Sequence, residues 1–388
     1  MASEAVESPL QAAVRIAPLA GEQAERTERD RALPPELIEE LRAAGLFHLC
    51  LPRSLGGAEA PPAETFAALE ALGAGDGAAG WCAMVASTSS LLGAYLPAAD
   101  AHAIFGGGAN VVAGVFAPRG RARRTEEGFV VDGRWSFASG ISHSDWMLGG
   151  CVVHGQDGPE LLAGERPDVR LMAMEKSRLE VIDTWSVSGL CGTGSHDVAA
   201  AEQPVPAGRG VSLFTDRPHE TGPLYSFPLF GLLALGIAAV ALGIARGAID
   251  DLISLAGGKR PAPGSRSVAE RSTVQAELAR AEASLRAARS LALEQIEAAW
   301  EAAEGGEALS DELRGGLRLA ATHATETAAL VATAMYRAGG GSSIYSSSPL
   351  QRRFRDANVA TQHMMVAPAT WELTGRLLFG LPTDTAQL

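Results

Sequence analysis

Apolar residues recur every three or four positions along two long stretches in the second half of the chain. One stretch runs through Val274, Leu278, Ala281, Leu285, Ala288, Ala292 and Ile296, and the other through Leu313, Leu317, Ala321, Ala324, Ala328, Val331 and Met335. This spacing predicts helices with one apolar face each. Because such faces bury one another in a bundle, a four-helix bundle is expected over residues 223–388.

A third stretch, residues 227–245, is apolar on every side and carries no charge. It is long enough to span a bilayer, but it is rich in Ala and Gly and lacks flanking aromatic and basic clusters, so it predicts a buried helix and no membrane partner. One bundle would cover only part of that helix. A second copy of the chain is therefore expected to cover the rest in a homotetramer, with Gly231, Gly236 and Gly243 allowing close approach.

The first hundred residues also follow a helical pattern, and Pro35 suits the first turn of one of these helices. Residues 75–80 read GDGAAG, a GxGxxG motif with Asp100 at the distance of a dinucleotide fingerprint. That fingerprint requires a preceding β-strand, whereas the residues before it have a helical pattern. A Rossmann domain and a nicotinamide site are therefore not expected.

From Asn110 the chain changes to short runs of β-branched and aromatic residues between turn signals, which is typical of strands. The runs are NVVAGVFA, GFVVDGRWSFAS, DWMLGGCVV and RLMAMEKSRLEVIDTW, and Asp132 with Gly133 is expected to form a tight turn. The predicted fold class is α+β. It has an N-terminal helical domain over residues 1–109, a middle β-barrel or sandwich domain over 110–222 and the bundle over 223–388.

Composition narrows the classes of function. The chain has 388 residues and a formal net charge of −13 with no basic stripe, which argues against a nucleic-acid partner. The four cysteines are far apart and form no CxxC pair, which indicates free thiols and no metal site. The first residues are acidic and do not form a secretory signal, so a cytoplasmic location is predicted.

The stretch most suggestive of a ligand site is residues 338–363, AGGGSSIYSSSPLQRRFRDANVATQH. Gly339 and Gly340 favour positive φ, and Pro349 suits the first turn of a helix. A loop without side chains before a helix N-terminus admits a flat or phosphorylated ligand, and the helix would carry His363 to it. The alternative is that Gly339 ends a helix and the loop behind it binds nothing.

This stretch resembles the acyl-CoA dehydrogenase superfamily, in which a GG loop and an RDA helix lie against a flavin. The dehydrogenases place a catalytic glutamate after the RDA arginine, which is Arg355 here. No carboxylate occurs between Asn358 and Thr370. The QH pair that ends at His363 instead resembles the two-component flavin-dependent monooxygenases of the same fold, which include dibenzothiophene monooxygenase, aromatic hydroxylases and amino-sugar nitrososynthases.

The resemblance extends to the middle domain. WSFASGISHSDW stands where the dehydrogenases have a W-I-T-N-G-like segment, and DTWSVSGLCGTGSHDV resembles the monooxygenase pattern that closes the domain. The first segment implies that Ser139 meets the N5 and C4-carbonyl edge of the flavin and that Trp135 and Phe137 supply aromatic surface. Alternatively, the two aromatic residues are ordinary strand residues that bind nothing. The other cofactor-binding residues implied are Gly339, Gly340, Arg355 and, across a subunit boundary, Arg266.

The resemblance implies the oxygenase component of a two-component monooxygenase. A separate NAD(P)H:flavin reductase would supply reduced FMN or FAD, oxygen would give a C4a-hydroperoxide, and one oxygen atom would pass to a small aromatic or polyketide-like substrate. His363, an imidazole expected to titrate near neutral pH, would position the peroxide or take a substrate proton, with Ser139 as the second catalytic residue. Three alternatives remain open: an N-oxygenase or nitrososynthase acting on an amine or amino sugar, an acyl-CoA dehydrogenase-like oxidoreductase with a displaced base, and a non-catalytic flavin-binding protein.

Overall fold

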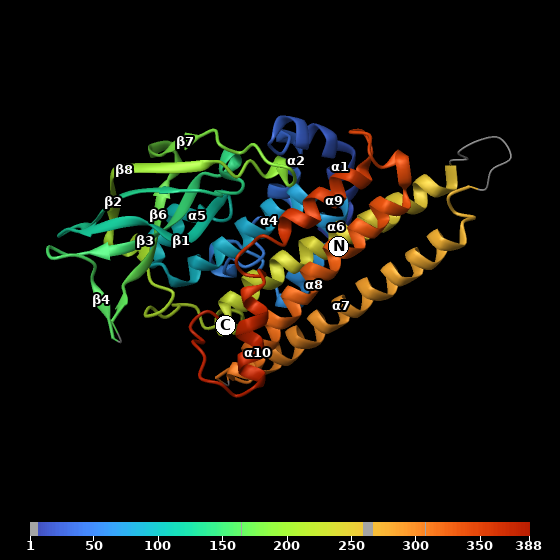
Figure 1. Ribbon diagram of the computed structural model, residues 1–388. Coiled ribbons are helices and arrows are strands. Elements are labelled where there is room, and N and C mark those ends of the chain that lie inside the picture. The colour runs from blue at the N-terminus through green and yellow to red at the C-terminus, as the bar shows by residue number, and fades with distance from the viewer. Residues whose placement is uncertain (1–6, 164, 259–266, 307) are drawn as a thin grey trace, which may run out of the picture.

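The computed structural model describes residues 7–163, 165–258, 267–306 and 308–388. Helices come first, strands follow, and helices complete the chain (Figure 1). The first helices are α1 (Pro9–Asp30), α2 (Pro35–Ala43), α3 (Pro62–Gly75), α4 (Gly77–Ser90) and α5 (Ala98–Phe105). The strands are β1 (Val112–Arg124), β2 (Gly128–Trp135), β3 (Trp146–His154), β4 (Leu161–Leu162), β5 (Arg166–Pro167), β6 (Val169–Glu175), β7 (Glu180–Ile182), β8 (Asp197–Pro206) and β9 (Gly210–Val211). The last helices are α6 (Leu229–Gly258), α7 (Ser272–Glu304), α8 (Asp311–Ala338), α9 (Pro349–Ala360) and α10 (Ala369–Leu378). The predicted α+β class is confirmed.

Several helices begin where the sequence provides a cap. At α1 the Ser8 hydroxyl accepts from the backbone N–H of Gln11, and the Gln11 side chain accepts from the backbone N–H of Ser8. This reciprocal pair satisfies amides that have no partner inside the helix. Helix α2 begins at Pro35 as predicted, because proline loses nothing at a position whose N–H would be unpaired.

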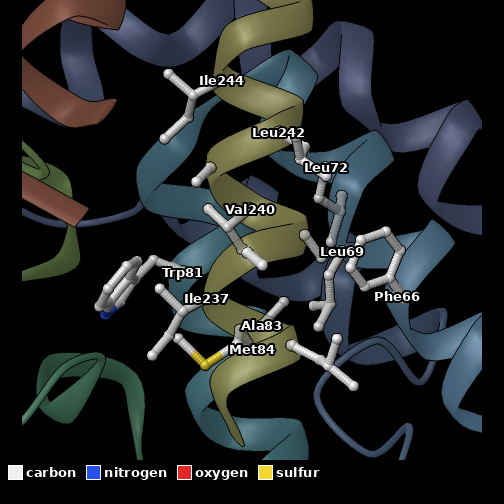
Figure 2. Close-up of a cluster of buried hydrophobic side chains, with 14 of the residues drawn as sticks. Phe66, Leu69, Leu72, Trp81, Ala83, Met84, Ile237, Val240, Leu242 and Ile244 are labelled. Carbon is white, nitrogen blue, oxygen red and sulfur yellow. The ribbon is translucent and has the colours of Figure 1, made fainter. Parts of the chain in front are cut away.

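Helix α6 is the core of the helical part of the molecule. It packs against α3 and α4 on one side and against α8 and α9 on the other (Figures 1 and 2). Its most apolar window is 78% buried within the single chain, so its apolar surface is already covered. The prediction that a second copy covers this helix is wrong, because helices α3, α4, α8 and α9 of the same chain cover it. The homotetramer itself stays a prediction.

The glycines of α6 allow close approach, as expected, but toward helices of the same chain. A Cβ atom on Gly231 would lie 2.7 Å from Leu317 of α8, and one on Gly236 would lie 2.8 Å from Met84 of α4. A Cβ on Gly243 would lie 2.2 Å from the backbone oxygen of Glu70 in α3. Helices α3 and α6 thus touch backbone to backbone at Gly243.

The predicted barrel or sandwich is realised as one mixed sheet of seven strands in the order β7-β8-β2-β1-β3-β6-β9. The β1–β3 pair is parallel and its neighbours are antiparallel. Strand β8 escaped the sequence analysis because AAAEQPVP has few β-branched residues and two prolines. The prolines are tolerated because β7 pairs only with the first residues of β8, which leaves Pro204 and Pro206 without a neighbour on that side.

The expected turn at Asp132 and Gly133 is wrong, since both residues lie inside β2. The chain reverses just before β2, where the backbone N–H of Thr125 donates to the oxygen of Gly128. Gly133 is needed for packing instead: a Cβ there would lie 2.7 Å from the Cα of Gly120 and 2.9 Å from the ring of Trp135. The glycine makes room for a tryptophan in the core of the sheet.

Candidate functional site

Three segments that are far apart in the sequence meet at one place: α4, the loop after β2 and the turn after α9. The indole Nε1–H of Trp81 on α4 donates to the hydroxyl of Ser139 at 3.2 Å. The ring of His363 lies edge-on to the same indole, with 5.8 Å between ring centroids. The structure therefore brings Ser139 and His363 together, and it does so through Trp81, which the sequence analysis did not single out.

Trp81 owes its position to the GDGAAG segment. Asp76 alone separates α3 from α4, and its carboxylate accepts from the backbone N–H of Ala79 at 2.9 Å, which caps α4. The rejection of a Rossmann fingerprint is confirmed, because a helix precedes the segment. Its glycines make a tight corner between two helices, from which Trp81 stands at the edge of the α6 cluster with its indole nitrogen turned away from α6 (Figure 2).

Behind Ser139 lies a chain of buried hydroxyl groups. The hydroxyl oxygens of Ser139 and Ser195 are 2.7 Å apart, and those of Ser195 and Thr193 are also 2.7 Å apart. The Thr193 hydroxyl then donates to the backbone oxygen of Leu190 at 2.8 Å. Thr193 and Ser195 belong to the GTGS segment, and each is 2% exposed. Water therefore has little access to these hydroxyls, and they depend on one another.

Leu190 is held in place by the helix that carries the RDA sequence. Its backbone N–H donates to Asp356 of α9 at 2.6 Å, and its φ of 52° is in the left-handed region that a leucine rarely adopts. Burial raises the pKa of Asp356 to about 7, and the nearby Asp76 acts in the same direction. Asp356 is thus a buried carboxyl that fixes the loop behind Ser139, a role that sequence alone did not indicate.

Arg355 does not present a free guanidinium to a cofactor. It pairs with Glu28 of α1 at 2.5 Å, donates to the backbone oxygen of Ser188 at 2.5 Å and donates to Gln351 at 2.7 Å. The role of Arg355 in binding the cofactor therefore stays a prediction. Its guanidinium instead fastens α9 to α1 and to the loop that leads to Leu190.

His363 lies in the turn after α9 and is half-buried. Burial, together with the nearby Arg318, lowers the pKa of His363 to about 4. Its Nδ1 lies 3.2 Å from the backbone N–H of Met365, which donates to it. The ring is therefore neutral at pH 7 with its proton on Nε2, and the expectation that it titrates near neutral pH is corrected.

Arg318 of α8 holds the turn that carries His363. Its guanidinium donates to the backbone oxygen of Met365 at 2.9 Å and to that of Gln387 near the end of the chain. It is 4% exposed, and burial lowers its pKa to about 10. Met365 thus accepts from Arg318 through its backbone oxygen and donates to His363 through its backbone N–H.

Phe137 is the exposed aromatic residue of the site. It precedes Ser139 by two residues, has a φ of 68° and is 70% exposed, and its ring lies edge-on to Trp185 at 6.0 Å between centroids. A left-handed conformation at a bulky residue costs on the order of 1–3 kcal/mol and is typical of functional sites. Phe137 thus presents an exposed ring two residues from Ser139.

The remaining predicted cofactor residues are placed differently. Trp135 is fully buried in the sheet, where its Nε1–H donates to the oxygen of Gly150 at 2.8 Å, so the expectation that it faces a ligand is wrong. Gly339 ends α8 with a φ of −67°, and a Cβ there would lie 2.2 Å from Ser343, so it packs tightly as in the helix-end alternative. Gly340 does have positive φ, 60°, and faces open space. Arg266 lies outside the described residues.

His143, close to Ser139 in the sequence, gives a testable pH effect. Its Nε2 is buried without a hydrogen-bond partner in the described part of the chain, and its ring stacks on Phe47. Burial, with Lys176 and Arg42 nearby, lowers the pKa of His143 to about 4. Because the unfolded chain takes up this proton near pH 6.5 and the folded chain only near pH 4, stability should fall as the pH drops through that interval, by up to about 3 kcal/mol.

We therefore expect His143→Phe, which keeps the stacking without a titrating nitrogen, to lose less stability than the parent between pH 7 and pH 4.5. Urea unfolding at both pH values measures this. His102→Phe on the exposed face of α5 is the matched control and should behave as the parent does. Equal losses in the parent and in His143→Phe would contradict the assignment.

The site combines polar and aromatic groups. Ser139 offers a hydroxyl oxygen, Phe137 offers an exposed ring held in a strained conformation, and His363 offers a neutral imidazole. Over the described residues no cluster of His, Cys, Asp and Glu could hold a metal ion.

Comparison with known families finds two matches within this chain. The acyl-CoA dehydrogenase N-terminal domain matches residues 11–98, and the acyl-CoA dehydrogenase C-terminal domain matches residues 235–368. The second match ends a few residues beyond His363. The two matches thus cover the helices on either side of the sheet.

Individual relatives extend the likeness over nearly the whole chain. Indole-3-acetate monooxygenase of Pseudomonas putida is 33% identical over 91% of this chain and 89% of its own length. The flavin-dependent monooxygenase oxygenase subunit HsaA of Rhodococcus jostii is 26% identical over 95% of this chain and 98% of its own. Among solved structures, XiaF from Streptomyces sp. in complex with FADH2 and glycerol is 27% identical and has a TM-score of 0.88, covering 97% of this chain and 96% of that one.

Proposed function

This chain belongs to the acyl-CoA dehydrogenase family, in its flavin-dependent monooxygenase branch, and from this premise we propose that it hydroxylates an indole-type aromatic acid at the site around Trp81, Ser139 and His363. It is a flavin-dependent oxygenase component that uses reduced flavin and oxygen. The observation that carries the proposed substrate class is the 33% identity to a relative named for indole-3-acetate. The aromatic surfaces of Trp81 and Phe137 support it.

Reduced flavin, when bound, supplies the electrons that activate oxygen for transfer of one atom to the substrate. In the proposal, Ser139 binds the polar edge of the flavin ring. The exposed ring of Phe137 contacts the flavin or the substrate from the solvent side. His363 acts through its Nε2–H, because Nδ1 already accepts from Met365. A neutral imidazole can hold or move a proton there without first losing a charge. The hydroxylase role fits a site in which a histidine, and no carboxylate, occupies the turn after α9.

The reduced flavin must reach this site from another protein. Relatives that are named as oxygenase subunits imply a separate flavin reductase, and GDGAAG forms a helix corner in place of a nicotinamide site. The choice between FMN and FAD, the homotetramer and the cytoplasmic location stay predictions. Light scattering on the purified chain would test the assembly.

We expect the purified chain, given chemically reduced FAD or FMN and ¹⁸O₂, to convert indole-3-acetate into a product that carries one labelled oxygen atom. Mass spectrometry detects that atom. Cyclohexaneacetate, which keeps the carboxylate and lacks the aromatic ring, is the matched control and should be recovered unchanged. NADH supplied without a reductase should not be consumed.

Two outcomes would contradict the proposal. If the reduced flavin is consumed and all of the indole-3-acetate is recovered without ¹⁸O, the proposed substrate class is refuted. Label found on the nitrogen of an amino sugar, with none on indole-3-acetate, would instead favour the N-oxygenase alternative.

A further inference from the structure

The hydroxyl groups of Ser139, Ser195 and Thr193 form a chain between the Trp81 indole and the Leu190 backbone oxygen. These two end groups require every hydroxyl hydrogen in the chain to point toward Leu190. We infer that this chain turns the Ser139 hydrogen inward and so makes Ser139 a hydrogen-bond acceptor toward the ligand, which selects reduced over oxidised flavin. The inference rests on the proposed function, in which Ser139 meets the N5 edge of the ring. It assigns Thr193 and Ser195 as positioning residues, although neither is expected to touch the flavin.

The two ends of the chain are fixed by chemistry. The indole nitrogen of Trp81 can only donate, so Ser139 accepts at that end. The backbone oxygen of Leu190 can only accept, so Thr193 donates at the other end. Leu190 cannot turn away, because its N–H is bound to Asp356 and its oxygen also accepts from the indole of Trp185 at 3.2 Å.

The middle of the chain then follows from counting hydrogens. Each hydroxyl has one hydrogen, and Thr193 uses its hydrogen on Leu190, so Thr193 must accept from Ser195. Ser195 has now used its hydrogen and must accept from Ser139. Ser139 in turn donates inward and accepts from Trp81, which leaves one lone pair and no hydrogen for a ligand. Burial of Ser139, Ser195 and Thr193 at 7%, 2% and 2% exposure limits the water that would offer other partners.

This polarity distinguishes the two redox states of a flavin. The reduced isoalloxazine carries a hydrogen on N5 and can donate to the Ser139 oxygen, whereas the oxidised ring has a bare N5 that only accepts. Against an acceptor, the reduced ring gains a hydrogen bond and the oxidised ring places lone pair against lone pair. A net hydrogen bond corresponds to roughly a tenfold change in affinity. The site would thus retain the flavin that a reductase delivers and release the flavin after turnover.

The test compares dissociation constants for oxidised and reduced flavin, measured by anaerobic equilibrium dialysis with FAD and with FMN. The parent chain should bind the reduced form more tightly. In Thr193→Val, Ser195 loses its acceptor and its hydrogen can turn to Ser139, which frees the Ser139 hydrogen to point outward. We expect the preference for reduced flavin to fall roughly tenfold in Thr193→Val and in Ser195→Ala. For this two-electron couple, a tenfold fall equals a decrease of about 30 mV in the difference between the reduction potential of the bound flavin and that of the free flavin.

Thr193→Ser keeps the hydroxyl and is the matched control, so it should keep the parental preference. An unchanged ratio in Thr193→Val, with reduced flavin still preferred by the parent, would overturn the inference while the monooxygenase assignment stands. A parent that prefers oxidised flavin would overturn it as well. A parent that binds neither form would refute the proposed function, and the inference with it. If Ser195→Ala fails to fold, the Thr193 pair decides the matter alone.

Discussion

Replacing His363 by alanine is expected to lower the rate of hydroxylation by about 10²- to 10⁴-fold while flavin still binds, because a positioned proton-transfer group commonly contributes that much. The imidazole is neutral, its Nδ1 is bound to the Met365 N–H, and its Nε2–H remains available beside Trp81. Alanine removes this group without disturbing Ser139. Product formed in a single turnover of reduced flavin with oxygen measures the loss.

The matched control is His102→Ala, which removes an exposed histidine of α5 outside the site and should leave the rate unchanged. Flavin dissociation constants, measured on the same samples, separate a loss of chemistry from a loss of binding. A His363→Ala variant that formed product within a factor of two of the parent would show that His363 only packs against Trp81. The pH profile is a second check: since the pKa of His363 is about 4, this residue should produce no change in rate between pH 6 and pH 8.

Replacing Gly243 by alanine is expected to destabilise the folded chain by about 3 kcal/mol or more. The new Cβ would lie 2.2 Å from the oxygen of Glu70, 2.7 Å from the nitrogen of Ala74 and 2.9 Å from the carbonyl carbon of Gly73. All three are backbone atoms, so no side chain can move aside and α3 must separate from α6. Overpacking of a core costs typically 1–3 kcal/mol, and a clash between two backbones lies at or above the top of that range, despite the better helix propensity of alanine.

Urea unfolding measures this effect, and the same helix provides the control. Gly257 of α6 has nothing within 4 Å of the position of a Cβ, so Gly257→Ala should change stability by no more than about 1 kcal/mol. If Gly243→Ala were as stable as Gly257→Ala, the close contact between α3 and α6 would not be needed for the fold. The comparison thus tests directly what covers α6.

Local patterns were sufficient to predict most of the helices. Residues such as Leu285, Ala288 and Ile296 on α7 repeat at the helical period, and all three are buried in the structure. Pro35 at the first turn of α2 and the change to β-branched runs after Asn110 also correspond to observed boundaries. These signals work because period, capping and turn chemistry act between residues that are close in sequence. Strand β8 was missed because its stability comes from pairing with β2, which leaves no local signal.

The candidate site was only partly visible in the sequence. Ser139 and His363 were predicted through a family resemblance, and the structure places them on either side of Trp81. Trp135, two residues before Phe137, was chosen wrongly, because it is fully buried. Both aromatic residues belong to the same run, and a regular strand would place residues two apart on one face without showing whether that face is covered. The structure decides this: glycines on neighbouring strands make room for Trp135, and Phe137 takes a left-handed conformation that turns it outward.

The residue pattern alone predicts an all-round apolar helix, a mixed helix and strand architecture, and the lack of a carboxylate where a dehydrogenase needs its base. The helices that cover this apolar helix, and the partners of Ser139, become apparent only in the folded chain. Helix α6 is covered by α3 and α8 of the same chain, and Ser139 is linked to Trp81 and Ser195. Periodicity specifies which faces must be buried, but the partner of a buried face or of a hydroxyl group is set by distances between remote segments, which exist only once the chain has folded.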